Sequence, residues 1–127
     1  MRPALSGITV GSGLTLSPAF DPSVYEYTID APWGGEPQQS VSFTITKTAD
    51  VYLGLTPEST VYGTLTFYQG NTIVRTQNGT KQASDNPTTK TIGATFGSQT
   101  ADCDRAVHKI SVNKDGVTAE YTITITR

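Results

Sequence analysis

The stretch Asp115-Gly-Val-Thr-Ala-Glu-Tyr-Thr-Ile-Thr-Ile-Thr-Arg127 decides the fold class of this chain. Tyr121, Ile123 and Ile125 alternate with threonines, which is the two-residue period of a strand with one buried face. Burying each of these apolar side chains stabilises the fold by roughly 1.5–3 kcal/mol. A register shift of one residue would place all three in water, so the pairing of this strand is tightly specified.

Most of the remaining sequence also predicts short strands. Residues 107–112 form one that a turn at Asp115-Gly116 joins to the final strand. Similar extended segments cover residues 8–10, 14–16, 25–29, 41–46, 65–67, 72–76 and 92–96. No capped stretch carries apolar residues at helical spacing. The spacing of strands and turns predicts an all-β fold, an immunoglobulin-like two-sheet antiparallel β-sandwich of about 7–9 strands.

Glycine and proline mark the connections. Gly11-Ser12-Gly13 separates two extended pieces and predicts a bend or a change of sheet. Residues 17–23 contain two prolines and form a connection, with Phe20 as the apolar side chain beneath it. Asn78-Gly79 predicts a turn that begins a polar, exposed loop over residues 80–90.

Length and composition favour one domain over residues 1–127, with a core that needs neither metal nor disulfide. Threonine is the most frequent residue, as suits a sheet-rich chain. The formal net charge of -2 argues against a nucleic-acid partner, which requires a basic surface. No apolar run is long enough to cross a bilayer. Cys103 is the only cysteine, so no intrachain disulfide forms.

Both ends of the chain resemble a known family. The first stretch is Leu14-Thr-Leu-Ser-Pro-Ala-Phe-Asp-Pro-Ser, followed by Tyr27-Thr-Ile29. The second is Ile110-Ser-Val112, followed by Asp115-Gly116 and the final strand. They are similar to the beginning and the end of the cadherin-like β-sandwich domains of bacterial surface proteins. The resemblance implies an immunoglobulin-like module of an extracellular or cell-wall protein, with no catalytic residues. Residues 49–100 depart from the family pattern, and we expect the features particular to this protein there.

Two groups of residues could carry chemistry. His108 is the only histidine and the only candidate base of a Ser-His-Asp triad, but it alternates with Val107 and Lys109 on a strand, so we expect a surface or edge-strand histidine. Asp102-Cys103-Asp104 supplies too few oxygen ligands for calcium. The carboxylates should raise the pKa of the thiol, so we expect a loop cysteine that is buried or open to an intermolecular disulfide.

Aromatic side chains are the main candidates for ligand or partner contacts. Trp33, Tyr52, Tyr62 and Tyr68 could stack on sugar rings or anchor a protein, or they could fill the ends of the sandwich. Tyr62 and Tyr68 are out of phase with Leu65 and Phe67, which predicts that they point outward or that both faces of their strand are covered.

The expected function is that of a non-enzymatic structural or adhesive module displayed on a bacterial cell surface or extracellular assembly. The alternatives are a phage virion decoration or tail protein and a carbohydrate-binding module. We expect a protein partner or a surface polysaccharide, no nucleic acid, no membrane insertion and no cofactor. A homo-oligomer or assembly subunit could form by strand addition at a sheet edge, with residues 1–7 as the donor.

Overall fold

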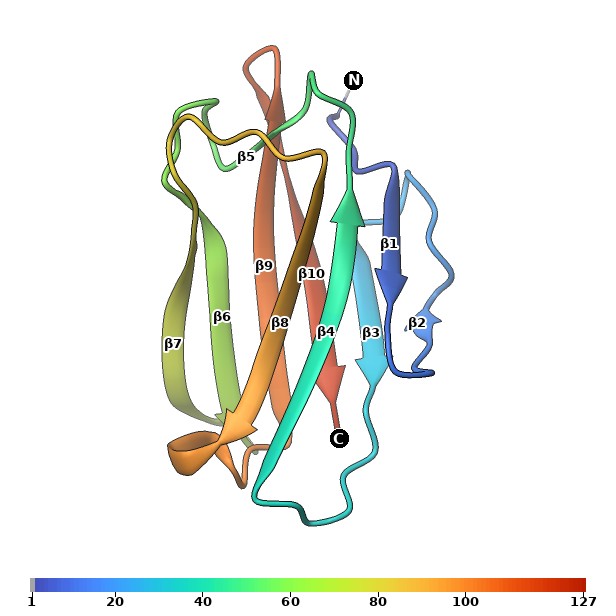
Figure 1. Cartoon of the computed structure of the whole chain (residues 1–127), viewed down its shortest axis with the longest axis vertical. Helices are drawn as coiled ribbons and strands as arrows, with labels where there is room; N and C mark the ends of the chain where they lie inside the picture. The colour runs from blue at the N-terminus through green and yellow to red at the C-terminus, as the bar shows by residue number, and fades with distance from the viewer. Residues whose placement is uncertain (1) are drawn as a thin grey trace.

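A computed structural model describes residues 2–127, which form ten strands and one short 3-10 turn (Figure 1). The strands are β1 (Gly7–Val10), β2 (Leu16–Ser17), β3 (Glu26–Asp30), β4 (Gln38–Thr46), β5 (Tyr52–Leu53), β6 (Val61–Gln69), β7 (Thr72–Thr80), β8 (Thr89–Gly97), β9 (Arg105–Lys114) and β10 (Val117–Thr126), and the turn is η1 (Ser98–Thr100). The all-β prediction is confirmed. Two of the ten strands have only two residues, which is why the count exceeds the predicted 7–9. Within residues 2–127, no helix is long and apolar enough to cross a membrane.

The strands form two facing sheets of unequal width, as predicted for a sandwich. The smaller sheet has the order β1-β4-β8, and the larger has the order β2-β3-β10-β9-β6-β7, with β5 also paired to β9. All pairs are antiparallel except β3 with β10, which run parallel. The predicted two-sheet sandwich is confirmed, and its antiparallel pairing fails only at this pair, because the chain enters β3 and β10 from the same end of the larger sheet (Figure 1).

The chain changes sheets between β1 and β2, as the glycines predicted. β1 pairs with β4 in the smaller sheet, whereas β2 pairs with β3 in the larger one. Ser12 and Gly13, with φ values of 60° and 72°, make the left-handed turn between them. Phe20 then stacks on Tyr27, with ring centroids 6.0 Å apart, beneath the proline-containing connection.

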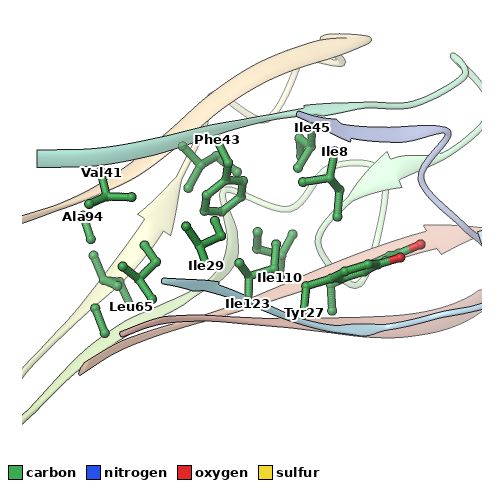
Figure 2. Packing of buried hydrophobic residues seen from close by; sticks show 14 of the residues in the cluster. Ile8, Tyr27, Ile29, Val41, Phe43, Ile45, Leu65, Ala94, Ile110 and Ile123 are labelled. Atoms are coloured by element: carbon green, nitrogen blue, oxygen red, sulfur yellow. The ribbon is translucent and has the colours of Figure 1, made fainter. Parts of the chain in front are cut away.

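The final strand contributes to the core as expected. Tyr121, Ile123 and Ile125 of β10 have no exposed surface, and β10 lies between β3 and β9 in the middle of the larger sheet. The inner faces of both sheets meet in one apolar cluster, in which Phe43 and Ile45 of β4 face Tyr27, Ile29, Ile110 and Ile123 (Figure 2). Phe67 meets Phe96 edge to face at 5.4 Å.

The interior is not purely apolar. His108 is 4% exposed and lies on the inner face of the central strand β9, so the prediction of a surface or edge-strand histidine is wrong. Its ring meets Phe43 edge-on at 5.1 Å. Burial lowers the pKa of His108 to about 4, and only the nearby Gly93 backbone opposes that shift. The imidazole is therefore neutral at pH 7, and a neutral ring is far cheaper to bury than a charged one.

The N-terminal segment belongs to the sandwich of its own chain. Pro3 and Leu5 are buried, and the Leu5 amide donates to the Tyr121 hydroxyl at 2.8 Å. The Tyr25 hydroxyl donates to the Pro3 carbonyl at 2.9 Å. Residues 1–7 were expected to donate a strand to another molecule, but residues 3–7 pack against the sandwich of their own chain. Met1 lies outside the described residues.

The middle of the chain holds a long hairpin. β6 turns through Gly70-Asn71 into β7, and β7 continues to Thr80, beyond the predicted end of this strand at residue 76. The predicted turn at Asn78-Gly79 is wrong, because both residues pair with β6. A Cβ at Gly79 would lie only 2.7 Å from the Tyr62 ring, so glycine serves here to let an aromatic ring lie against the backbone. The polar connection that follows is shorter than predicted, since Thr80, Thr89 and Lys90 lie in strands.

Candidate functional site

The four aromatic candidates do not form one site. Trp33 follows β3, at the end of the sandwich where the C-terminus lies, and Tyr52 lies at the opposite end (Figure 1). Tyr62 is buried at the start of β6, and Tyr68 is half-buried near the end of the same strand.

Trp33 takes part in a stack that closes one end of the sandwich. The Arg127 guanidinium lies 3.9 Å from the Trp33 ring centroid and 4.1 Å from that of Phe96. Arg127 also donates to the Cys103 carbonyl at 2.7 Å and to the Ala101 carbonyl. Arg127 therefore covers one face of the Trp33 ring, and the side chain as a whole is 37% exposed.

The Asp102-Cys103-Asp104 segment lies in the same region. Cys103 is 1% exposed, and burial raises the pKa of its thiol, with Asp104 and Asp102 adding to the increase and Arg127 opposing it. The carboxylate effect was predicted, but burial is larger. Of the two alternatives for Cys103, the structure shows the buried one. No group of three or more His, Cys, Asp or Glu residues in the described part of the chain is arranged to hold a metal ion.

A β-bulge separates the two tyrosines of β6. Tyr62 is the extra residue between Val61, paired with Thr80, and Gly63, paired with Gly79. The bulge turns the Tyr62 side chain into the interior, where burial raises its pKa. Tyr68 stays on the outer face, where the Arg105 guanidinium lies 4.2 Å from its ring centroid. The expectation of an outward side chain thus holds for Tyr68 and is wrong for Tyr62.

Tyr52 lines a hollow at the other end of the sandwich. The hollow has a volume of about 380 Å³, and its lining includes Leu55, Asp50 and Asp115. Leu55 is 64% exposed. Asp50 pairs with Lys114 at 3.2 Å. Tyr52 therefore combines an accessible hollow with neighbouring polar groups. Tyr62 lines a smaller hollow of about 210 Å³ beside Lys109 and Glu120, but its own side chain is buried.

The most exposed element is one that the aromatic residues did not indicate. β7 is a nine-residue edge strand, and every residue in it is exposed except Gly79, which is half-buried. β6 pairs with one side of β7, and no strand within residues 2–127 pairs with the other. Ile73 is 59% exposed and Val74 is 36% exposed. In Figure 1, β7 lies beyond the smaller sheet, which leaves both of its faces open.

A groove runs between β7 and the end of β8. It has a volume of about 310 Å³ and is lined by Phe67 and by polar residues, namely Gln38, Arg75, Gln77, Thr95, Ser98 and Thr100. Arg75 Nε donates to Gln77 Oε1 at 3.2 Å, and these two side chains share the inner face of β7. The sequence signal for this surface is the absence of alternation in Thr-Ile-Val-Arg-Thr-Gln-Asn-Gly-Thr, which is typical of a strand with no buried face.

β7 and the groove beside it form an accessible strand edge, and Tyr52 marks a second, somewhat larger hollow at the other end of the molecule. No family model, curated protein or solved structure matches this chain, so its function is inferred from the geometry described above.

Proposed function

We propose that this chain is a non-enzymatic structural or adhesive module, displayed on a bacterial cell surface or extracellular assembly, that binds a protein partner through the edge of β7. The observation that carries the proposal is a nine-residue edge strand with both faces open and one side unpaired within residues 2–127. The cadherin-like pattern at the two ends of the sequence supports display at a surface.

The β7 edge suits strand addition better than the other strand edges do. An added strand gains main-chain hydrogen bonds along the edge and side-chain contacts on both faces. β1 and β2, which form other edges, have only four and two residues. β8, the remaining edge, is as long as β7, but it contains Lys90 and buries Ile92, Ala94 and Phe96 in the core, so only one of its faces is open. Proteins commonly protect long edges with proline, lysine or a cover, and β7 contains neither of those residues. Its one charged residue is Arg75, and its protection is limited to bulges in its pairing with β6.

The hairpin that carries β7 is held firmly against the core. Phe67 of β6 packs on Phe96, and the Tyr62 ring lies against Gly79 of β7 itself. These contacts fix the edge in one orientation, which lowers the entropy lost when a partner strand binds. A rigid edge of this kind is suited to a lasting, structural attachment.

Adhesion of coated beads tests the proposal. Fluorescent beads carrying the chain are passed over bacterial cells in a flow chamber, with albumin-coated beads as the background. We expect wild-type beads to adhere and the double variant Ile73→Lys, Thr76→Lys to lose adhesion by at least about tenfold, because charged side chains block edge pairing. The matched control, Val117→Lys with Thr118→Lys, adds the same charge on exposed positions of β10 and should adhere normally.

Two results would contradict the proposal. One is that wild-type beads adhere no more than albumin-coated beads, or that the two double-lysine variants lose adhesion equally. The other is turnover of an ester, peptide or glycoside substrate that His108→Ala abolishes, which would contradict the non-enzymatic part.

The Tyr52 hollow favours carbohydrate binding as a second candidate function. An aromatic face beside carboxylates is the arrangement that binds sugar rings by stacking and hydrogen bonding. Calorimetric titration with soluble bacterial polysaccharides should show binding that Tyr52→Ala abolishes and Trp33→Ala preserves. Binding that Trp33→Ala abolishes and Tyr52→Ala preserves, or no heat of binding with any polysaccharide, would contradict this second function.

A further inference from the structure

The regular part of the β7 edge is short and has a defined centre. Bulges interrupt the pairing of β6 with β7 near both ends, at Tyr62 and at Val74. Between them, the register is continuous from Gly63 opposite Gly79 to Phe67 opposite Arg75. The straight stretch of β7 therefore runs over residues 75–79, and its midpoint is Gln77.

We propose that the occupant of this edge is the β7 strand of a second copy of the chain, paired antiparallel about a two-fold axis at Gln77. This inference rests on the proposed function and names its partner. In this register, Arg75 of each copy lies opposite Gly79 of the other, and Thr76 lies opposite Asn78. A two-fold pair of this kind uses the same surface on both copies, so it closes as a dimer.

The charges on β7 are compatible with pairing to itself. Arg75 is the only charged residue of the strand, and the net charge of the chain is only -2. The two-fold axis separates the two Arg75 positions by four residues along the strand direction, which is about 13 Å. No like charges then face each other directly across the interface, an arrangement that would oppose pairing.

The position opposite Arg75 is also shaped to receive it. Gly79 has no side chain, and the Tyr62 ring lies against it, with Cζ 2.7 Å and Oη 3.0 Å from where a Cβ would stand. Positions 75, 77 and 79 alternate onto the same face of the strand. The Tyr62 ring is 7% exposed and already has the Lys90 Nζ 5.6 Å from its centroid. A long side chain arriving opposite Gly79 can therefore lay its apolar stem across the glycine and the adjoining edge of this ring. The two-fold axis makes this contact twice.

The open faces of β7 leave room for a second sandwich. The smaller sheet ends at β8, so the joined hairpins of the two copies would lie side by side without a covering strand. Gln77 of one copy would lie beside Gln77 of the other, with Cβ atoms about 4.5–5.5 Å apart. The interface is thus sensitive to the residue at this one position.

Sedimentation velocity tests the proposal on the intact chain over a concentration series up to about 500 µM, a range that detects dissociation constants in the micromolar range and above. We expect a monomer–dimer equilibrium that Gln77→Lys weakens at least about tenfold, because it places two like charges opposite each other. The matched control Gln69→Lys makes the same change on an exposed residue of β6 in the same hairpin and should leave the equilibrium within about twofold of wild type.

A cysteine placed on the axis gives an independent readout. In a Cys103→Ala background, oxidised Gln77→Cys should form a disulfide-linked dimer, since directly opposed strand residues approach the Cβ separation of a disulfide. Gln69→Cys should not. A monomer at every concentration, equal effects of the two lysine variants, equal cross-linking of the two cysteine variants, or growth beyond a dimer would each overturn the proposal. A monomeric result would leave the bead assay as the separate test of the proposed function.

Discussion

Acid should destabilise this protein through one buried side chain, His108. Its pKa is about 4 in the folded chain, against an ordinary value of 6.5. The folded state therefore holds the ring neutral in a range where the unfolded state protonates it. The stability that depends on the neutral ring is complete above pH 6.5 and is lost as the pH falls toward 4. A difference of this size corresponds to about 3 kcal/mol over the window.

The variant His108→Leu isolates this effect. Leucine has a similar size and fits the apolar surroundings, which include Phe43. It also removes Nε2, a buried atom with no hydrogen-bond partner among the described residues, and with it the hydrogen bond of the ring to the Gly93 backbone. These two effects are opposite and each of about 1–3 kcal/mol, so the net gain in stability at pH 7 should be small. The advantage of the variant over wild type should grow by about 3 kcal/mol more between pH 7 and pH 4.

Urea unfolding, followed by circular dichroism at several pH values from 7 to 4, measures both quantities. Lys109→Leu, which changes the exposed neighbour on β9, is the control and should follow the wild-type pH profile. Asp21 and Asp50 have folded pKa values below the usual 3.8, so the stability that they contribute is lost only at lower pH. Parallel pH profiles for wild type and His108→Leu would refute the argument that the buried ring sets the acid response.

Three further predictions concern packing. Gly63→Ala should destabilise the fold by about 3 kcal/mol or more, because its Cβ would lie within the backbone of β9. Gly11→Ala is the control and should change the stability little, since no atom lies within 4 Å of its Cβ. Urea unfolding midpoints measure both effects. Arg127→Ala should cost about 2 kcal/mol through lost charged hydrogen bonds and stacking, and an unchanged melting temperature would contradict that role. Cys103 should react with a thiol reagent only at the rate of local or global opening, so rapid labelling of the native protein would show that the cysteine is not buried as described.

The parts of the fold that follow local rules could be predicted from the sequence. The alternation of Tyr121, Ile123 and Ile125 predicted the buried face of β10, and Asp115-Gly116 predicted the turn before it, with φ values of 52° and 80° in the structure. Gly11-Ser12-Gly13 predicted the change of sheet. In each case a short-range requirement, either a two-residue period or a left-handed backbone, was sufficient to predict the local structure.

The candidate site depended on long-range features that local patterns do not contain. The bulge at Tyr62 shifted the phase of β6, so a tyrosine predicted to point outward became buried. His108 was misplaced because its burial depends on β9 being a central strand. The exposure of β7 follows from the order of strands in the larger sheet and from the narrowness of the smaller one. The lack of alternation in residues 72–80 indicates a strand with no buried face, but the strand order and the sheet width that leave its edge free depend on the rest of the chain.

The position of β10 also has a consequence for synthesis of the chain on the ribosome. β10 separates β3 from β9, so the first strands of the larger sheet have no neighbour on that side until residues 117–126 have been translated. A nascent chain that lacks these residues exposes two incomplete sheet fragments with unpaired edges, which are prone to misassociation. Completion of the sandwich therefore has to follow translation of residues 117–126, and until then these edges stay open to pairing with other chains.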